Sequence, residues 1–297
     1  MRIAVTTDFS GQSQEAFGIA GSLATQFSAE LYVLHHAQPT ILPRSQDVDT
    51  FYSSLQEKLS GLIASHTAFE GLNAQPLLVH SGNVINFAKT VKEQDIDLLV
   101  MATHGHTGFK HFFLGSFVER AIRFSHCPVL VCQVSAPEEQ TTPNVDFRRM
   151  LVAHDFSSQS LVAVDFAHQW ARMLKAKTRL LHVIDTESGV TGFEVELFSN
   201  WHEYHEKKKK EAQKLLQELI RGALKDIKAE RRVTIGHPGL EILSQAEDFA
   251  ADLIVIGTHG GSVLERYLLG SVAQRVVREA TCPVLLVREP WSPPDAS

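Results

Sequence analysis

The chain reads LIVIGTHG over residues 253–260 and, after nine further residues, Gly-Ser at residues 270–271. The near-copy LLVMATHG covers residues 98–105, and Gly-Ser follows after the same interval at residues 115–116. In each copy, an apolar run typical of a buried strand leads into a glycine loop, and the loop ends where a helix pattern begins. The pattern therefore indicates two equivalent halves, each organised around a strand, a loop and a helix.

The glycine loop and the helix start together have the geometry of an anion site. Glycine lacks Cβ, so such a loop can adopt positive φ and let a ligand approach its N–H groups. A helix start carries unpaired N–H groups and a partial positive charge, both of which favour a phosphate. A structural reading is equally open, because Ser116 with Glu119 and Ser271 with Gln274 match capping boxes.

Strand-like runs alternate with amphipathic helix patterns in both halves, and the runs are apolar on both faces. Such runs are typical of parallel sheets covered by helices on both sides. We predict an α/β fold with two repeats of a five-stranded parallel sheet in the order 3-2-1-4-5, similar to a Rossmann fold. The expected strands are residues 3–6, 31–35, 76–79, 98–101 and 128–131, and then residues 151–154, 180–184, 233–236, 253–256 and 284–287.

An Asp-Phe-Ser motif follows the first strand of each half and begins at Asp8 and at Asp155. In open parallel sheets, ligands bind beyond the carboxyl ends of the strands, where the strand order reverses. In the predicted order this aspartate and the glycine loop flank the reversal, so each half is expected to have one crevice there. An Asx turn or a helix N-cap is the structural alternative for both aspartates.

The length of 297 residues allows two domains, each with its own core. Residues 137–143, PEEQTTP, are polar, flanked by proline and without periodicity, which is typical of a linker. We expect a first domain at residues 1–136, a linker at 137–147, a second domain at 148–289 and a tail at 290–297.

Composition argues against several partners. The net charge of −6 gives no reason to expect nucleic acid or an anionic membrane. No run approaches the roughly 18–20 apolar residues of a membrane span, and no basic-then-apolar leader precedes the first strand. The three cysteines form no Cys-x-x-Cys pair, which favours a reducing cytoplasm. The fifteen histidines are scattered, so we expect no metal site.

These residues resemble the universal stress protein family in its tandem two-domain form, over nearly the whole chain. The specific part is the pattern Gly, two residues, Gly, nine residues, Gly-Ser/Thr, which in that family accompanies nucleotide binding. The first half departs from it at Ala102, which replaces the leading glycine. The matching residues are Gly257, Gly260, Gly270 and Ser271 in the second half and Gly105, Gly115 and Ser116 in the first.

The resemblance also implies roles for other residues. Asp8 and Asp155 would lie against the nucleoside, and the residue after the histidine of the second strand would line the adenine slot. That residue is Val183 in the second half, but in the first half it is His36, which would change base preference or close the slot.

Two cations inside the nine-residue loops, Lys110 and Arg266, are candidates for contacts with phosphate, because charge-assisted hydrogen bonds would strengthen binding. A surface charge without a role is the alternative for each. The ligand implied is ATP or AMP, with or without Mg²⁺.

The resemblance implies a cytoplasmic stress-response protein that binds ATP or a related adenine nucleotide and uses occupancy as a regulatory signal. One alternative is a slow ATP hydrolase, but the loops offer no Asp/Glu pair to bind metal and orient water, so we expect no catalytic residues. Another is a scaffold, or a binder of another small ligand, whose glycine loops are structural. Pairing through the last strands, known in the family, implies an intramolecular pseudo-dimer here, with a homodimer as the alternative.

Overall fold

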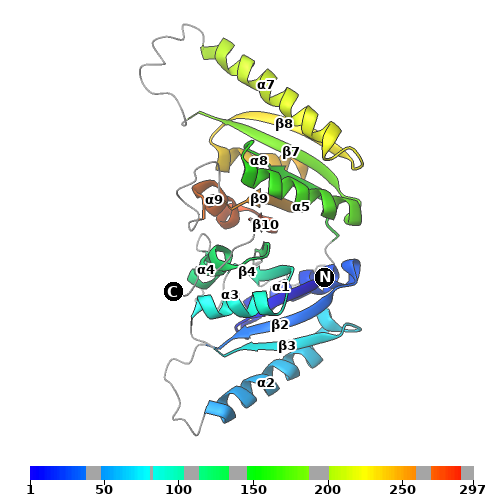
Figure 1. The fold of residues 1–297 in the computed structure, drawn as a ribbon, viewed down its shortest axis with the longest axis vertical. Coiled ribbons are helices and arrows are strands. Elements are labelled where there is room, and N and C mark those ends of the chain that lie inside the picture. The colour runs from blue at the N-terminus through cyan, green and yellow to red at the C-terminus, as the bar shows by residue number, and fades with distance from the viewer. Residues whose placement is uncertain are drawn as a thin grey trace. The chain divides into compact units, whose positions relative to one another are not determined.

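A computed structural model describes residues 1–37, 48–80, 83–103, 114–133, 146–186, 201–258 and 269–288 (Figure 1). It divides the chain into two compact units. Unit 1 contains Met1–Asp146, and unit 2 is Phe147–Arg288. Among the described helices, none is long and apolar enough to cross a membrane.

Unit 1 is a parallel sheet in the order β3-β2-β1-β4-β5, with helices between successive strands. Right-handed crossovers place α1 and α2 on one face of such a sheet and α3 and α4 on the other, and α3 packs against α4. The elements are β1 (Arg2–Thr7), α1 (Gly11–Phe27), β2 (Glu30–His36), α2 (Val48–Ser65), the short 3-10 helix η1 (Thr67–Phe69), β3 (Ala74–Val79), α3 (Val84–Glu93), β4 (Leu98–Ala102), α4 (Ser116–Phe124) and β5 (Val129–Cys132).

Unit 2 repeats the order as β8-β7-β6-β9-β10, so the predicted fold class and the strand order 3-2-1-4-5 are confirmed. The elements are β6 (Arg149–Ala153), α5 (Ser158–Leu174), β7 (Lys177–Asp185), α7 (Trp201–Gly222), β8 (Ala229–Gly236), α8 (Pro238–Phe249), β9 (Leu253–Gly257), α9 (Ser271–Glu279) and β10 (Val284–Val287).

The core of each unit lies around its central strands. Every residue of β4 and of β9 is buried, because helices cover both faces of these strands. In unit 1, α1 approaches η1 closely at Gly21, where an added Cβ would stand 2.3 Å from the carbonyl oxygen of Ala68. Glycine is needed there because the backbones of the two helices nearly touch.

Candidate functional site

A cavity of about 350 Å³ opens in unit 2 at the carboxyl ends of β6 and β9, where the strand order reverses. Its volume falls within the roughly 300–1,000 Å³ that is usual for small-molecule sites. The ends of β6, β7 and β9 and the first turns of α8 and α9 contribute its walls. Five residues predicted from the sequence line it: Asp155, Val183, Gly257, Gly270 and Ser271.

The remaining predicted residues lie in unit 1 or outside the described residues. Asp8 follows β1, and Gly115 and Ser116 stand at the start of α4, so they occupy the matching end of the unit 1 sheet. The predictions that fall outside the described residues concern Gly105, Lys110, Gly260 and Arg266.

The carboxylate of Asp155 holds the turn between β6 and α5. Its Oδ1 accepts a hydrogen bond from the amide of Ser157 at 3.0 Å, which is an Asx turn. Ser157 then caps α5 by accepting a hydrogen bond from the amide of Ser160 at 3.2 Å. Burial alone would raise the pKa of Asp155, but hydrogen bonds from Ser157 and Ser160 hold it below its usual value. The structural role predicted as the alternative is present, and the same ionised carboxylate lines the cavity.

A ring contact beside this aspartate is common to both units. Phe156 has a φ of 64°, a conformation that strains a residue with a side chain. Its ring packs against His182 at a centroid distance of 4.4 Å, and Nδ1 of His182 donates to the carbonyl of His154 at 2.9 Å. In unit 1, Phe9 has a φ of 66° and packs against His35 at 4.3 Å. The strained turn is thus fixed by packing and sets the position of the aspartate before it.

The start of α9 differs from the predicted capping box. Ser271 is the first helical residue, Gly270 stands at the N-cap position, and no side chain caps the helix. In unit 1, α4 begins in the same way at Gly115 and Ser116. The capping-box predictions are therefore wrong, because each serine lies one position inside its helix. The first turn of α9 reaches the cavity without a side-chain cap.

Positive φ is not the reason for glycine at the helix starts. Gly115 and Gly270 have φ values of −57° and −58°, which any residue adopts. At Gly115, an added Cβ would be 3.4 Å from the carbonyl oxygen of Thr103, at the edge of ordinary contact. The amide of Gly270 donates to the carbonyl of Thr258 at 2.8 Å, which ties the helix start to the end of β9.

The apolar part of the cavity includes three aliphatic side chains: Val183 near the end of β7, Ile242 on α8 and Val272 in the first turn of α9. None of them offers a hydrogen-bonding group, so this part of the cavity suits a flat apolar or aromatic group. The ionised Asp155 and the uncapped start of α9 supply an acceptor and a weakly positive wall beside it.

Unit 1 carries aromatic rings at the three equivalent positions. The equivalence follows from the repeat. His36 and Val183 are each the seventh residue of their strand, Phe117 and Val272 are each the second residue of their helix, and Phe87 and Ile242 each stand 11 residues before the strand that follows, at Leu98 and Leu253. The pairs are His36 and Val183, Phe87 and Ile242, and Phe117 and Val272.

These three rings contact one another. His36 stacks on Phe117 with centroids 5.0 Å apart and planes inclined by 19°. Phe87 meets both rings edge-on, at 5.0 Å from Phe117 and 5.8 Å from His36, and its side chain is fully buried. The rings therefore lie together in the region of unit 1 that corresponds to the apolar part of the cavity.

Ala102, where unit 1 departs from the glycine pattern, does not account for the difference between the units. It is the last residue of β4 and pairs with Cys132 of β5, so its backbone is extended and accommodates a methyl group.

Sequence reasoning did not predict Ile242 as a cavity residue. In the structure Leu240 is 52% exposed, whereas Ile242 is buried and lines the cavity. Both residues are apolar, and only the packing of α8 against the sheet selects between them.

His154 is a second cavity residue that sequence reasoning missed. It is 4% exposed, and neither ring nitrogen has a hydrogen-bond partner within the described ranges. Burial lowers its pKa, so the ring is neutral near pH 7. In unit 1 the equivalent residue is Thr7, whose hydroxyl lies 3.0 Å from that of Ser13. The difference between Thr-Asp-Phe-Ser and His-Asp-Phe-Ser was the available signal.

Comparison with known proteins gives consistent matches. The model of the "Universal stress protein family" matches residues 1–133 and 146–288. Universal stress protein YxiE of Bacillus subtilis (strain 168) is 37% identical over 147 residues, which is 48% of this chain and 99% of that protein. The solved structure of a universal stress protein from Archaeoglobus fulgidus DSM 4304 has a TM-score of 0.69 and 20% identity, and the match covers 97% of this chain and 96% of that one.

A universal stress protein solved in complex with cAMP is 26% identical to this chain, with a TM-score of 0.34. The match covers 48% of this chain and 98% of that one.

Proposed function

Because the chain belongs to the universal stress protein family, we propose that unit 2 binds an adenine nucleotide in the cavity at the carboxyl ends of β6 and β9. Occupancy of that cavity is the signal of this protein in a cytoplasmic stress response. The observation that carries the proposal is the convergence of three features on one cavity: an ionised acceptor at Asp155, an aliphatic slot, and the uncapped start of α9.

The charges in the cavity orient the nucleotide. The carboxylate of Asp155 accepts hydrogen bonds from ribose hydroxyls or from the adenine amino group, and it repels phosphate. The phosphates therefore lie toward Gly270 and Ser271, where the helix field favours negative charge. The base lies in the slot formed by Val183 and its two aliphatic neighbours.

Unit 1 has no such slot in this proposal. The rings of His36, Phe87 and Phe117 stand where the base would lie, so the chain binds one adenine nucleotide rather than two. Asp8 keeps its role in the turn, because its Oδ1 accepts a hydrogen bond from the amide of Ser10 at 3.0 Å.

Mg²⁺ would arrive with the phosphates. In the part of the chain that the structure describes, no cluster of three or more His, Cys, Asp or Glu side chains could hold a metal by itself. The phosphate oxygens would then supply most of the ligands, as is usual for Mg²⁺ bound with a nucleotide.

Thermal melting of the full chain tests the proposal. ATP with and without Mg²⁺ and cAMP are the probes, and inorganic triphosphate is the control for anion binding alone. A nucleotide at 100 times its Kd stabilises the folded state by about 2.7 kcal/mol, which raises Tm by several degrees. A rise with ATP and none with triphosphate supports the proposal, whereas no rise with either nucleotide contradicts it.

A further inference from the structure

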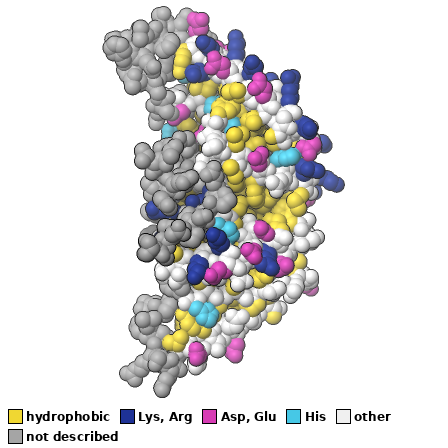
Figure 2. All heavy atoms as spheres, viewed as in Figure 1, with side chains coloured by type: hydrophobic (Ala, Val, Ile, Leu, Met, Phe, Trp, Pro, Cys, Tyr) yellow, Lys and Arg dark blue, Asp and Glu magenta, His cyan; other side chains and the backbone are white. Residues whose placement is uncertain are grey.

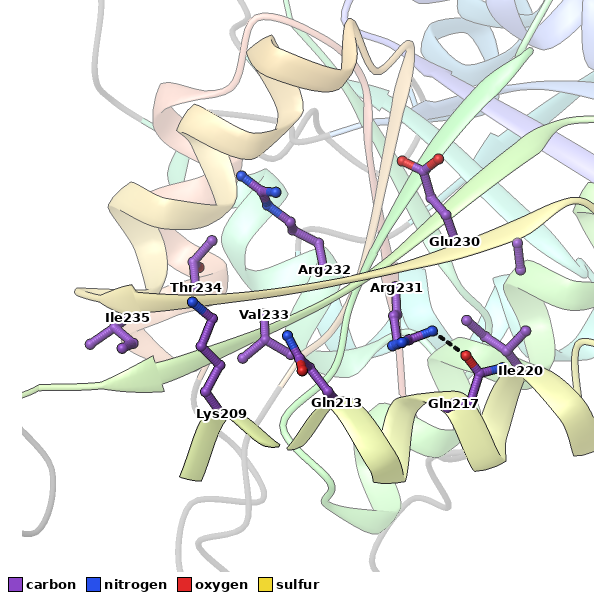
Figure 3. Close-up of a pocket in the computed structure, with 11 residues that line it drawn as sticks. Lys209, Gln213, Gln217, Ile220, Glu230, Arg231, Arg232, Val233, Thr234 and Ile235 are labelled. Carbon is purple, nitrogen blue, oxygen red and sulfur yellow. Dashed lines mark hydrogen bonds between the residues drawn. The ribbon is translucent and has the colours of Figure 1, made fainter. Parts of the chain in front are cut away.

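A second hollow of unit 2 lies between α7 and β8, where basic residues gather (Figure 3). It is a groove of about 770 Å³, and its walls include seven consecutive residues of β8, Ala229 to Ile235. Neighbouring strand residues point to opposite faces of a sheet, and Figure 3 shows Arg231 pointing toward α7 and Arg232 pointing away from it. A groove lined by residues of both faces runs along the edge of the strand.

β8 is the outermost described strand of unit 2 and pairs with β7. The outer edge of such a strand presents N–H and C=O groups that can pair with another chain. In unit 1 the equivalent edge strand, β3, contains Pro76, which has no N–H to donate to a ladder. The register gives Arg231 that position in β8, so the edge of β8 keeps a donor that β3 lacks.

Positive charge borders this edge. Three cationic side chains line the groove: Lys209 on α7, and Arg231 and Arg232 on β8. Among the described residues, no carboxylate forms an ion pair with them. Arg231 donates to the side-chain oxygen of Gln217, and Nε of Arg232 donates to that of Gln245 at 3.1 Å. Figure 2 shows Lys and Arg side chains along the border of unit 2 on which α7 lies.

The carboxylate of Glu230, which also lines the groove, does not cancel these charges. It pairs with Lys177 at 2.6 Å and with Arg179 at 2.8 Å, on the β7 side of the strand. Two cations thus compensate Glu230, and the groove keeps an excess of positive charge.

We propose that the edge of β8 binds an extended, acidic segment of a partner protein, which adds a strand to the sheet of unit 2. Main-chain hydrogen bonds along β8 supply the ladder, and alternate acidic side chains of the segment, which share one face, meet Lys209 and Arg231 on the α7 side. The alternative role of cationic residues on an edge strand is to deter pairing between identical chains. In that role, the groove would have no affinity for an acidic strand.

Fluorescence anisotropy with the full chain tests this proposal. The probe is a labelled peptide of four Glu-Val repeats, and the comparison peptides are four Lys-Val repeats and Glu-Val repeats with N-methyl groups at alternate residues along one edge or the other. We expect salt-sensitive binding of the Glu-Val peptide alone, and at least a tenfold loss when one of the two edges is methylated. No binding, or binding unaffected by methylation of either edge, overturns the proposal.

Matched variants locate the site. Lys209→Gln with Arg231→Gln should weaken binding at least tenfold, whereas Lys210→Gln with Lys214→Gln, which removes two exposed charges of α7 outside the groove, should leave it unchanged. Equal effects of the two pairs overturn the proposal. Self-association of the chain that is lost in the Lys209→Gln, Arg231→Gln variant would assign the edge to a second copy. The chain has its own Glu-Val-Glu stretch at residues 194–196. Binding gained only after Glu194→Gln with Glu196→Gln would assign the edge to the chain itself. Either result overturns the proposed partner.

Discussion

The imidazole ring of His36 stacks on the ring of Phe117, with centroids 5.0 Å apart and planes inclined by 19°. At the equivalent places in unit 2, Val183 and Val272 line a cavity of about 350 Å³. The two units share one fold and one turn after the first strand. They differ in the side chains at these positions, which are rings in unit 1 and aliphatic groups in unit 2, and the proposed function depends on this difference.

Moving the rings into unit 2 should abolish nucleotide binding. The variant combines Val183→His, Ile242→Phe and Val272→Phe. These side chains already pack together in unit 1, so the chain should stay folded. Its affinity for ATP should fall by a factor of about 100 or more, equivalent to about 2.7 kcal/mol. Calorimetric titration with ATP measures the affinity, and circular dichroism checks the fold. The matched control, His36→Val with Phe87→Ile and Phe117→Val, should leave the affinity of unit 2 unchanged. Wild-type affinity in the ring-filled variant would refute the site.

The negative charge of Asp155 in unit 2 should contribute to ATP binding, whereas that of Asp8 in unit 1 should not. Asp155→Asn keeps a side-chain oxygen for the Asx turn but removes the negative charge. A hydrogen bond to a charged group contributes about 1.5–3 kcal/mol, so the Kd for ATP should rise by about 10- to 150-fold. Asp8→Asn alters the equivalent turn and should leave the Kd unchanged. Equal effects of the two substitutions would contradict the assignment to unit 2.

Unit 2 should lose stability in mild acid because burial lowers the pKa of His154 and of His182. The unfolded chain takes up protons on both rings as the pH falls below about 6.5, whereas the folded chain does not until its lower pKa is reached. Between about pH 6.5 and the folded pKa, each ring therefore lowers the free energy of unfolding by at most about 1.4 kcal/mol per pH unit. Asp155, whose folded pKa is also lowered, adds to the loss only at more acidic pH.

The variant His154→Thr, which copies Thr7, should flatten this dependence. Denaturant unfolding at pH 7.5 and at pH 5.5 measures this pH dependence. The fluorescence of the buried Trp170 monitors the unfolding of unit 2, in a chain that also carries Trp201→Phe and Trp291→Phe. An unchanged difference between the two pH values would show that His154 does not contribute.

Two glycines in helices of unit 1 should respond to alanine in opposite directions. Alanine has the higher helix propensity, and at Gly61 an added Cβ meets no atom within 4 Å, so Gly61→Ala should stabilise by about 0.5–1 kcal/mol. At Gly21 the Cβ would stand 2.3 Å from the carbonyl oxygen of Ala68, and overpacking of this kind costs about 1–3 kcal/mol. Scanning calorimetry should therefore show a higher Tm for the first and a lower Tm for the second. A higher Tm for both would mean that α1 and η1 separate without cost.

The fold was predictable from the sequence because the strands are apolar on both faces and the pattern occurs twice. Runs such as residues 253–256 allow only a buried strand within so regular an alternation with helices, and the parallel order follows from connections through helices. The helix faces were harder to predict. On α3 and α8 the apolar Ile85 and Leu240 are 53% and 52% exposed, whereas the residues two positions later, Phe87 and Ile242, are buried.

Part of the candidate site followed from the sequence, because Asp155, Gly257 and Gly270 each stand at the end of a strand or the start of a helix. The filling of the unit 1 slot did not follow. His36 was recognisable as a departure, but Phe87 lies on α3 and Phe117 on α4, and the packing of those helices brings their rings together. Contacts between separate elements depend on tertiary packing, which a local pattern does not encode.

Calorimetric titration of the full, wild-type chain with ATP tests the central claim most directly, because it counts sites as well as measuring affinity. The account predicts one ATP per chain, with no heat of binding left in the Val183→His, Ile242→Phe, Val272→Phe variant. Two ATP molecules per chain, or one that the variant still binds, would contradict it.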